Sequence, residues 1–199
     1  MADHIDTGLV MATELEALPL ISGGGFARVG TAPFPVYVKD AAVLVLSGVG
    51  KSNAAAATAW LICQYKPRRV CNAGASGATG DALELGQVFQ IGEICEPDRP
   101  RLRCAGSDPL RADPIADLPT ARLATQDHVV MDEERRRIES KADLVDMEGA
   151  AVVQTCRSFG VPVHLVKYVS DVHDGHNISD SIVLLRDAFC CQLRDQILA

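Results

Sequence analysis

The sequence lacks several features that would place it in common classes of protein. No C-x-x-C pair occurs among its seven cysteines, and no apolar run approaches the roughly 18 residues that a membrane span needs. The opening residues, MADHIDTG, carry acids where a signal peptide would carry basic residues. We therefore interpret the cysteines as small buried hydrophobes in a reducing compartment, and we expect a cytoplasmic protein with no membrane span.

The chain also lacks a surplus of basic residues. It has 19 Lys and Arg against 26 Asp and Glu, and the net charge of −7 argues against a nucleic-acid partner. The longest arginine run, Arg135–Arg137, lies among glutamates, and we expect it to form the solvated face of a helix. No internal repeat or low-complexity linker divides the 199 residues, which predicts a single domain over 1–199.

Apolar, β-branched segments alternate with helical segments along the chain. Strands are predicted at Gly8–Met11, Val36–Val38, Ala41–Ser47, Arg69–Asn72, Gln87–Ile94, Arg122–Thr125, Leu144–Met147 and Val163–Val169. Helices are predicted at Ser52–Tyr65, Asp132–Lys141, Glu148–Phe159 and Ile182–Leu198. Residues 96–122, rich in Pro, Arg and Asp, are expected to form a surface excursion. The alternation predicts an α/β fold with a mostly parallel sheet flanked by helices.

Acidic motifs fall at or just after three of the predicted strand ends. They are Glu14/Glu16, Asp146/Glu148 and Ser170-Asp171. Ligands of open α/β sheets bind beyond the carboxyl ends of the strands, so we expect these carboxylates to meet in one pocket. Plainer interpretations stay open, because acids favour helix N-termini and Ser-Asp is an ordinary helix cap.

Three further segments carry residues that are common in binding sites. Gly48-Val49-Gly50-Lys51-Ser52 resembles the end of a phosphate loop, but Val45 stands where that pattern needs a glycine, so we expect a glycine turn. The small residues of Asn72–Ala78 allow either a tight turn or close approach of a ligand to the backbone. His173-Asp174-Gly175-His176 matches no zinc spacing, and we interpret it as a polar loop.

Taken together, the motifs resemble the nucleoside phosphorylase and nucleosidase superfamily. Within it they are closest to the methylthioadenosine/S-adenosylhomocysteine nucleosidases and the futalosine hydrolases. The motifs are Thr13-Glu14-Leu15-Glu16, Ser47-Gly48-Val49-Gly50-Lys51, Asn72-Ala73-Gly74-Ala75-Ser76-Gly77, Val145-Asp146-Met147-Glu148-Gly149-Ala150 and Val169-Ser170-Asp171. Each alone is weak, whereas their shared order and intervals are specific. The resemblance implies a three-layer αβα sandwich with a central mixed, mostly parallel sheet, and a homodimer that needs neither cofactor nor metal.

The resemblance also implies roles for individual residues. Asp171 resembles the general acid that protonates N7 of a purine, and Glu16 resembles the base that activates water. The implied substrate-binding residues are Glu148, Met147, Ser170, Val129, Val130, Ser76, Gly77 and Lys167. Carboxyl groups suit this chemistry, because the purine leaves as an anion unless it is protonated, and a carboxylate can accept hydrogen bonds from both ribose hydroxyls.

Water is favoured over phosphate as the nucleophile. Phosphorylases of the superfamily bind phosphate with arginines, one in a Gly-Asp-Pro-x-x-Arg loop after the first strand and one before the Gly-Ser turn. Here Glu14 and Glu16 occupy the first place and Asn72 the second, and carboxylates would repel a phosphate dianion. We therefore expect hydrolysis of a purine nucleoside, of the 5′-modified adenosine type.

Departures from the nucleosidase pattern keep other functions open. Lys167 replaces an arginine, Val129 replaces an aromatic residue that stacks on the base, and Asp146 replaces a glutamate. A purine nucleoside phosphorylase and a hopanoid-associated adenosyl-cleaving relative are alternatives of the same class. A nucleoside-binding protein without turnover and a P-loop nucleotide hydrolase are alternatives of other classes.

Overall fold

A computed structural model describes residues 4–99, 110–115, 117–172 and 178–198. The strands are β1 (Thr7–Met11), β2 (Ala27–Gly30), β3 (Val36–Lys39), β4 (Ala42–Leu46), β5 (Arg69–Ala78), β6 (Val88–Cys95), β7 (Leu110–Arg111), β8 (Thr120–Thr125), β9 (Leu144–Asp146) and β10 (Val163–Asp171). The helices are α1 (Glu14–Ser22), α2 (Lys51–Tyr65), α3 (Asp132–Ile138), α4 (Gly149–Phe159) and α5 (Ile178–Ile197). No helix of the described residues is long and apolar enough to cross a membrane.

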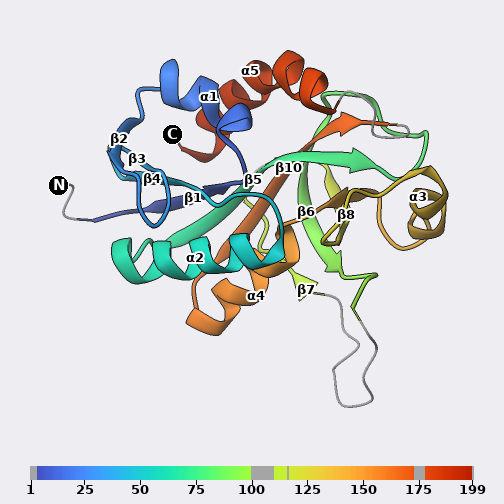
Figure 1. Ribbon diagram of the computed structural model, residues 1–199, viewed down its shortest axis with the longest axis horizontal. Coiled ribbons are helices and arrows are strands. Elements are labelled where there is room, and N and C mark those ends of the chain that lie inside the picture. Colours follow the sequence, from blue (N-terminus) through green and yellow to red (C-terminus); the bar gives the residue numbers. More distant parts are fainter. Residues whose placement is uncertain (1–3, 100–109, 116, 173–177, 199) are drawn as a thin grey trace.

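One mixed sheet forms the middle layer of the molecule (Figure 1). Strand β1 pairs in parallel with β4 and β5, and β2, β3 and β4 form an antiparallel meander. Helices α1 and α5 pack together on one face of the sheet, and α2 and α4 pack together on the other (Figure 1). The predicted α/β sandwich of the nucleoside phosphorylase type is therefore confirmed.

Half of this sheet closes on itself. Strand β10 pairs with both β5 and β6, while β9 pairs with both β5 and β8, so β5, β10, β6, β8 and β9 follow one another around a ring. The register places Asp171 of β10 and Val145 of β9 opposite the same residue, Gly77 of β5. Ring closure thus brings two motifs that are distant in sequence to the two sides of one glycine.

Strand β5 is longer than the sequence predicted. We expected a strand over Arg69–Asn72 and then a turn, whereas the strand continues without a break to Ala78. Residues 73–77 continue because β10 pairs with them, and β9 pairs with Gly77 and Ala78. The small side chains of this segment therefore serve close packing between neighbouring strands rather than a turn.

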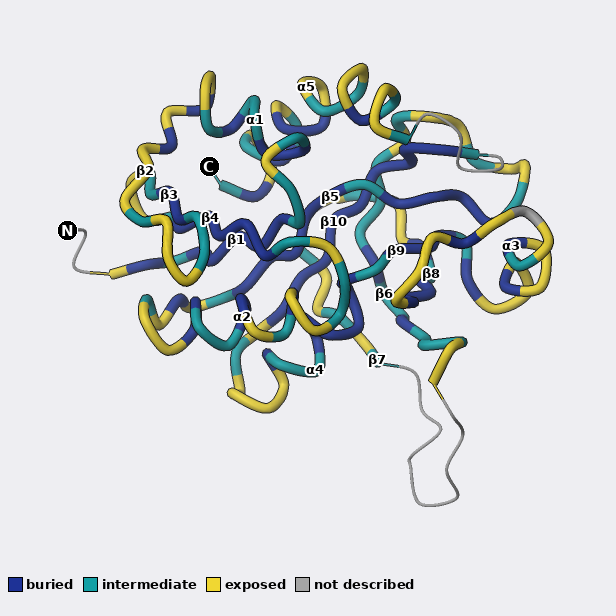
Figure 2. The backbone as a smooth tube through the Cα atoms, viewed as in Figure 1, coloured by how far each residue is buried: buried dark blue, intermediate teal, exposed yellow. Residues whose placement is uncertain are grey.

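Alternate residues of the central strands face opposite sides of the sheet, as strand geometry requires. In β1, Leu9 packs with Leu20 and Phe189 on the α1/α5 side, and Val10 packs with Leu61 and Val152 on the α2/α4 side. Figure 2 shows that the sheet is buried while exposed residues lie along the outer helices. Burying such a side chain contributes about 1.5–3 kcal/mol, so this double-sided core holds the strand ends in fixed positions.

Candidate active site

A cavity of about 260 Å³ lies at the carboxyl ends of β5 and β10 and is also lined by residues of α3 and of the start of α5. Nine of the predicted site residues line it: Glu16, Ser76, Gly77, Val129, Val130, Met147, Glu148, Ser170 and Asp171. Lys167 is fully buried and does not contribute to the lining. The structure therefore brings together residues from separate motifs, as the strand-end argument predicted.

Glu16 lies in the first turn of α1, a helix that the sequence analysis did not predict. Its Oε2 accepts hydrogen bonds from the Thr13 hydroxyl at 2.7 Å and the Thr13 amide at 3.1 Å, and the Thr13 Oγ1 accepts one from the Glu16 amide. This reciprocal pattern is a capping box, and its sequence signature, Thr-x-x-Glu, was the signal that could have found the helix. The other carboxylate oxygen of Glu16, Oε1, accepts a hydrogen bond from the Ala75 backbone amide at 2.9 Å, so Glu16 joins α1 to β5.

Glu148 follows β9 and sits at the start of α4. Its Oε1 accepts a hydrogen bond from the Gly50 amide at 2.8 Å, which connects the glycine turn to the cavity. Burial, followed by the nearby Asp146 carboxylate, raises the pKa of Glu148 from 4.5 to about 7, although Lys167 opposes the shift. Near neutral pH, Glu148 therefore exists in both protonated and ionised forms.

Lys167 forms a buried ion pair with Asp146, with 2.8 Å between Nζ and Oδ2. Asp146 also accepts hydrogen bonds from the Thr125 hydroxyl at 2.6 Å and the Gly149 amide at 2.8 Å. Burial lowers the pKa of Lys167, but Asp146 and Glu148 raise it by more, so this side chain remains a cation. A contact between Lys167 and the substrate stays a prediction.

Asp171 ends β10 and receives contacts on both carboxylate oxygens. The Ser170 hydroxyl donates to Oδ1 at 2.7 Å, and Nη2 of Arg135 donates to Oδ2. A β-carbon added to Gly77 would lie 2.9 Å from Asp171 Oδ2 and 3.0 Å from Arg135 Nη2. A residue without a side chain is therefore needed at position 77, because the strand passes directly beneath this ion pair.

The prediction that Arg135–Arg137 form a solvated face is wrong for the first of the three residues. Arg136 and Arg137 are exposed, whereas Arg135 is only 4% exposed and lines the cavity. Its guanidinium reaches three acceptors, the Val130 and Ala78 carbonyls at 3.0 Å each and the Asp171 carboxylate, which compensate its burial. Helical spacing could have indicated this burial, because Arg135 and the buried Ile138 lie three residues apart and therefore on the same face of α3.

Comparison with known proteins agrees with this arrangement. The family model described as the phosphorylase superfamily matches residues 7–99 and 120–190. The chain belongs to the phosphorylase superfamily. It is 29% identical over 167 residues to a 5′-methylthioadenosine/S-adenosylhomocysteine nucleosidase of Staphylococcus aureus, and the match covers 69% of this chain and 72% of the relative.

Solved structures of superfamily members share the fold over nearly the whole chain. A 5′-methylthioadenosine/S-adenosylhomocysteine nucleosidase from Neisseria meningitidis, in complex with methylthio-immucillin-A, is 25% identical with a TM-score of 0.82, covering 97% of this chain and 98% of that one. A futalosine hydrolase mutant of Helicobacter pylori is 17% identical with a TM-score of 0.84 and the same coverage. At 17% identity, the second likeness shows the fold alone.

In this superfamily member the segment Gly48–Ser52 forms the expected glycine turn. Gly48 and Gly50 have φ angles of +82° and +102°, a region that favours glycine, and α2 begins at Lys51. The Lys51 ammonium binds Asp98 at 2.9 Å and Glu96 at 3.5 Å, so it ties the start of α2 to the segment after β6. Val49 of the turn lines the cavity and the Gly50 amide binds Glu148 there, whereas Lys51 does not contribute to the lining.

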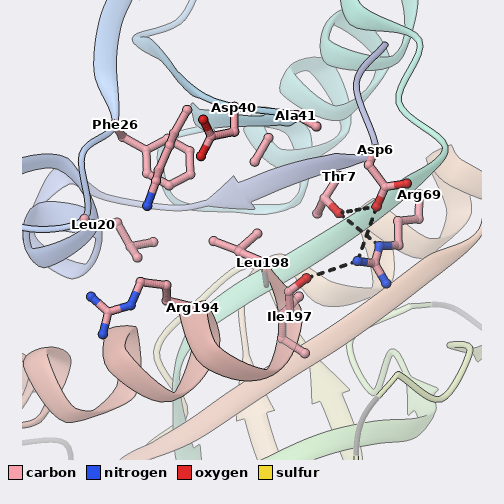
Figure 3. A pocket seen from close by; sticks show the side chains of 13 residues that line it. Asp6, Thr7, Leu20, Phe26, Asp40, Ala41, Arg69, Arg194, Ile197 and Leu198 are labelled. Atoms are coloured by element: carbon pink, nitrogen blue, oxygen red, sulfur yellow. Dashed lines mark hydrogen bonds and ion pairs between the residues drawn. The ribbon is translucent and has the colours of Figure 1, made fainter. Parts of the chain in front are cut away.

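A second cavity, of about 320 Å³, lies away from the strand ends of the predicted site, at the opposite ends of β1 and β5 (Figure 3). Arg69 lines this cavity and donates hydrogen bonds to the Thr7 hydroxyl at 2.9 Å and to the Ile197 carbonyl at 3.1 Å. Arg194 and Asp40 lie on its other side (Figure 3). None of the five sequence motifs contributes to this cavity, so we do not place the chemistry there.

The segment His173–His176 lies outside the described residues. Within the described part of the chain, no cluster of three or more His, Cys, Asp or Glu side chains is arranged to hold a metal ion.

Proposed function

We propose that this chain is a purine nucleosidase that hydrolyses the N-glycosidic bond of a 5′-modified, adenosine-type nucleoside. One observation carries the proposal: the carboxylates of Glu16, Glu148 and Asp171 come from three separate elements and line one cavity. Each is fixed by hydrogen bonds to neighbouring backbone or hydroxyl groups. The nucleosidase relative in Staphylococcus aureus supports the same reaction class.

Asp171 acts as the general acid in this proposal. The C1′–N9 bond breaks with its electron pair moving to the purine, and a proton from Asp171 to N7 prevents build-up of an anionic leaving group. The Ser170 hydroxyl bound to Oδ1 orients the carboxyl group, which leaves Oδ2 on the side of Gly77 and Arg135. Orientation matters because proton transfer requires hydrogen-bond reach to N7.

Glu148 binds the sugar, and Met147 packs beside it. The ionised Glu148 carboxylate can accept hydrogen bonds from two adjacent ribose hydroxyls, which fixes C1′ relative to the other groups. Its bond from the Gly50 amide occupies only Oε1, so the second oxygen keeps its capacity to accept.

Glu16 activates the attacking water. Its carboxylate is held by the Thr13 hydroxyl and the Thr13 and Ala75 amides, so the acceptor is oriented before substrate binds. Water attacks C1′ while Glu16 accepts its proton, which parallels the division between acid and base in glycosidases. The products are the free purine and the sugar with a hydroxyl at C1′.

Three observations favour water over phosphate, the nucleophile of the alternative phosphorylase function. Glu16 projects into the cavity where the phosphorylase pattern has an arginine loop. The side-chain amide of Asn72, which stands where the phosphorylases have their second arginine, donates to the Val10 carbonyl at 3.1 Å inside the core. Asn72 is 1% exposed. Arg135, the one arginine lining the cavity among the described residues, already contacts Asp171.

The test measures release of free base with and without phosphate. Methylthioadenosine, S-adenosylhomocysteine, adenosine and inosine are incubated with the pure protein, and the base is separated by chromatography. We expect release without phosphate and no acceleration by it. Release that requires phosphate would assign the protein to the phosphorylases, and absence of release from every nucleoside tested would contradict this substrate range.

We also propose that the protein is a cytoplasmic homodimer. Val49, Val129 and Met131 are each about half exposed, and Val49 and Val129 line the cavity that we assign as the active site. Apolar side chains gathered at such a rim are typical of an interface. A second copy packed there would cover these residues and exclude water from the site.

A further inference from the structure

The first turn of α1, which carries Glu16, contains a carbonyl group that its own helix cannot satisfy. In an α-helix the Leu15 carbonyl would accept a hydrogen bond from the N–H of residue 19, four positions later. That residue is Pro19, which lies inside the helix, and proline has no N–H. The proline ring also crowds the carbonyl four residues before it. The Leu15 carbonyl therefore needs a donor from another part of the chain.

Arg186 of α5 supplies that donor. Its Nη1 donates to the Leu15 carbonyl at 2.8 Å across the contact between α1 and α5, which lie side by side on one face of the sheet (Figure 1). Cys190, one turn further along the same face of α5, donates from its Sγ to the Glu16 carbonyl at 3.5 Å. Two side chains of α5 thus hold two consecutive carbonyls of the turn that carries the proposed base.

The position of this turn matters to the active site. Leu15 and Glu16 both line the cavity. Thr13 and Ala75 orient the carboxylate of Glu16, whereas the bond from Arg186 holds the backbone from which that side chain extends. A base must lie within hydrogen-bond reach of the water whose proton it takes, so a displaced backbone would slow the chemical step.

We propose that Arg186 is a positioning residue for Glu16. It replaces the helical N–H that Pro19 lacks, and so fixes the turn of α1 from which Glu16 reaches the cavity. Arg186 does not contribute to the cavity lining, so it acts through the backbone of Leu15 rather than on the substrate. The catalytic consequence rests on the proposed nucleosidase function, whereas the anchoring of α1 does not.

Two other roles for Arg186 predict different results. If Arg186 acts through its positive charge, lysine should replace it fully and removal of Pro19 should have no effect. If it only packs α5 against α1, a new hydrogen-bond donor within α1 should not correct its loss. The proposed role alone depends on whether the Leu15 carbonyl has a donor. Restoring the missing N–H therefore separates the three roles.

The experiment is a double-mutant cycle between Arg186→Met and Pro19→Ala, which gives α1 the N–H that it lacks. With 5′-methylthioadenosine as substrate, we expect Arg186→Met to lower kcat about tenfold with little change in KM, because Glu16 acts in the chemical step. Pro19→Ala alone should leave kcat unchanged, since Arg186 already donates to the Leu15 carbonyl. The double variant should recover most of the lost rate, because residue 19 then supplies the donor.

Arg194→Met is the matched control, because Arg194 lies on the same helix and its guanidinium binds Asp195 instead of α1. It should leave kcat unchanged with or without Pro19→Ala. Circular dichroism checks the fold of each variant. If Arg186→Met does not fold, Arg186→Lys takes its place in the cycle, because lysine has a single ammonium instead of the guanidinium fork. We then expect a smaller loss of kcat that Pro19→Ala again restores, and no loss would overturn the inference.

Amide hydrogen exchange of α1, followed by mass spectrometry, gives a second reading that does not depend on turnover. Local opening of a helix becomes more frequent when a contact that holds it is removed. We expect the amides of residues 14–22 to exchange about tenfold faster in Arg186→Met than in the wild-type protein. In the double variant, exchange should return to the wild-type rate.

The outcomes for the inference and for the proposed function are distinct. Base release by the wild-type protein, with kcat unchanged in Arg186→Met or with a loss that Pro19→Ala does not restore, would overturn the inference and leave the nucleosidase function standing. If no nucleoside is cleaved, the proposed function fails and hydrogen exchange decides the anchoring of α1. Faster exchange that Pro19→Ala reverses supports the inference, whereas unchanged or unreversed exchange overturns it.

Discussion

Asp171 illustrates how a single carboxyl group is positioned by its neighbours. Ser170 donates to one oxygen and Arg135 to the other, while Gly77 leaves the space in which the pair sits. We expect Asp171→Asn to lower kcat for purine nucleosides by about 100-fold or more, because an amide cannot transfer a proton to N7. Base release under single-turnover conditions measures the effect, and a circular dichroism spectrum checks the fold. A variant that retained full activity would remove Asp171 from the mechanism.

We expect Glu148 to make the stability of the protein depend on pH. The folded protein holds its proton up to about pH 7, whereas the unfolded chain releases it near the ordinary pKa of 4.5. Folding therefore binds a proton within this window, and the free energy of unfolding falls as the pH rises through it, by up to about 3 kcal/mol. We expect urea unfolding to show this loss as the pH rises from about 4.5 to about 7.

The Glu148→Gln variant tests the origin of that pH dependence. An amide does not ionise, so the decline in unfolding free energy should become smaller than in the wild-type protein. Glu139→Gln is the control, because Glu139 is exposed and its replacement should leave the decline unchanged. A decline of the same size in Glu148→Gln would show that other groups cause it.

At the scale of single elements, the start of α1 couples helix stability to the proposed catalytic base. Thr13 caps the helix and also donates its hydroxyl to the Glu16 carboxylate. We expect Thr13→Ala to lower the free energy of unfolding by about 1 kcal/mol and to slow base release, since Glu16 loses a donor that orients it. Urea unfolding and initial rates measure the two effects.

Two further variants separate the cap from the rest of the helix. Thr13→Ser keeps the hydroxyl and should restore most of the rate and the stability. Ser22→Ala removes a hydroxyl at the other end of α1, where Ser22 donates to the Leu18 carbonyl on the exposed surface, and it should change neither quantity measurably. A slow Thr13→Ser variant would contradict the proposed coupling.

At the scale of the whole molecule, the apolar rim of the cavity predicts assembly. We expect light scattering to give about twice the chain mass of 21.2 kDa for the wild-type protein. Met131→Asp should shift the mass toward the monomer, because it places a charge among the exposed apolar residues. Phe159→Asp, at the exposed end of α4, is the matched control and should remain a dimer. Dissociation by Phe159→Asp alone would place the interface elsewhere.

The sequence by itself determined the layers, the family and most of the residues around the cavity. Apolar periodicity suffices for the layers, because it marks β1, β4, β10, α2 and α4 along the chain, and Gly160 ends α4 as the sequence predicted. The family came from the resemblance of the five motifs and their order. The motif order then indicated Glu16, Glu148 and Asp171, which line the same cavity in the structure.

Tertiary structure alone decided the path of β5 and the place of Arg135. Residues 73–78 have the composition of a turn, yet they form a strand because β10 and β9 supply partners from more than 60 residues further along the chain. The arginines and glutamates next to Arg135 in the sequence predict an exposed charge. Arg135 is buried instead, because acceptors from β5, β10 and the loop before α3 meet around its guanidinium. Neither feature is encoded locally, since each depends on contacts that exist only after the ring of strands has closed.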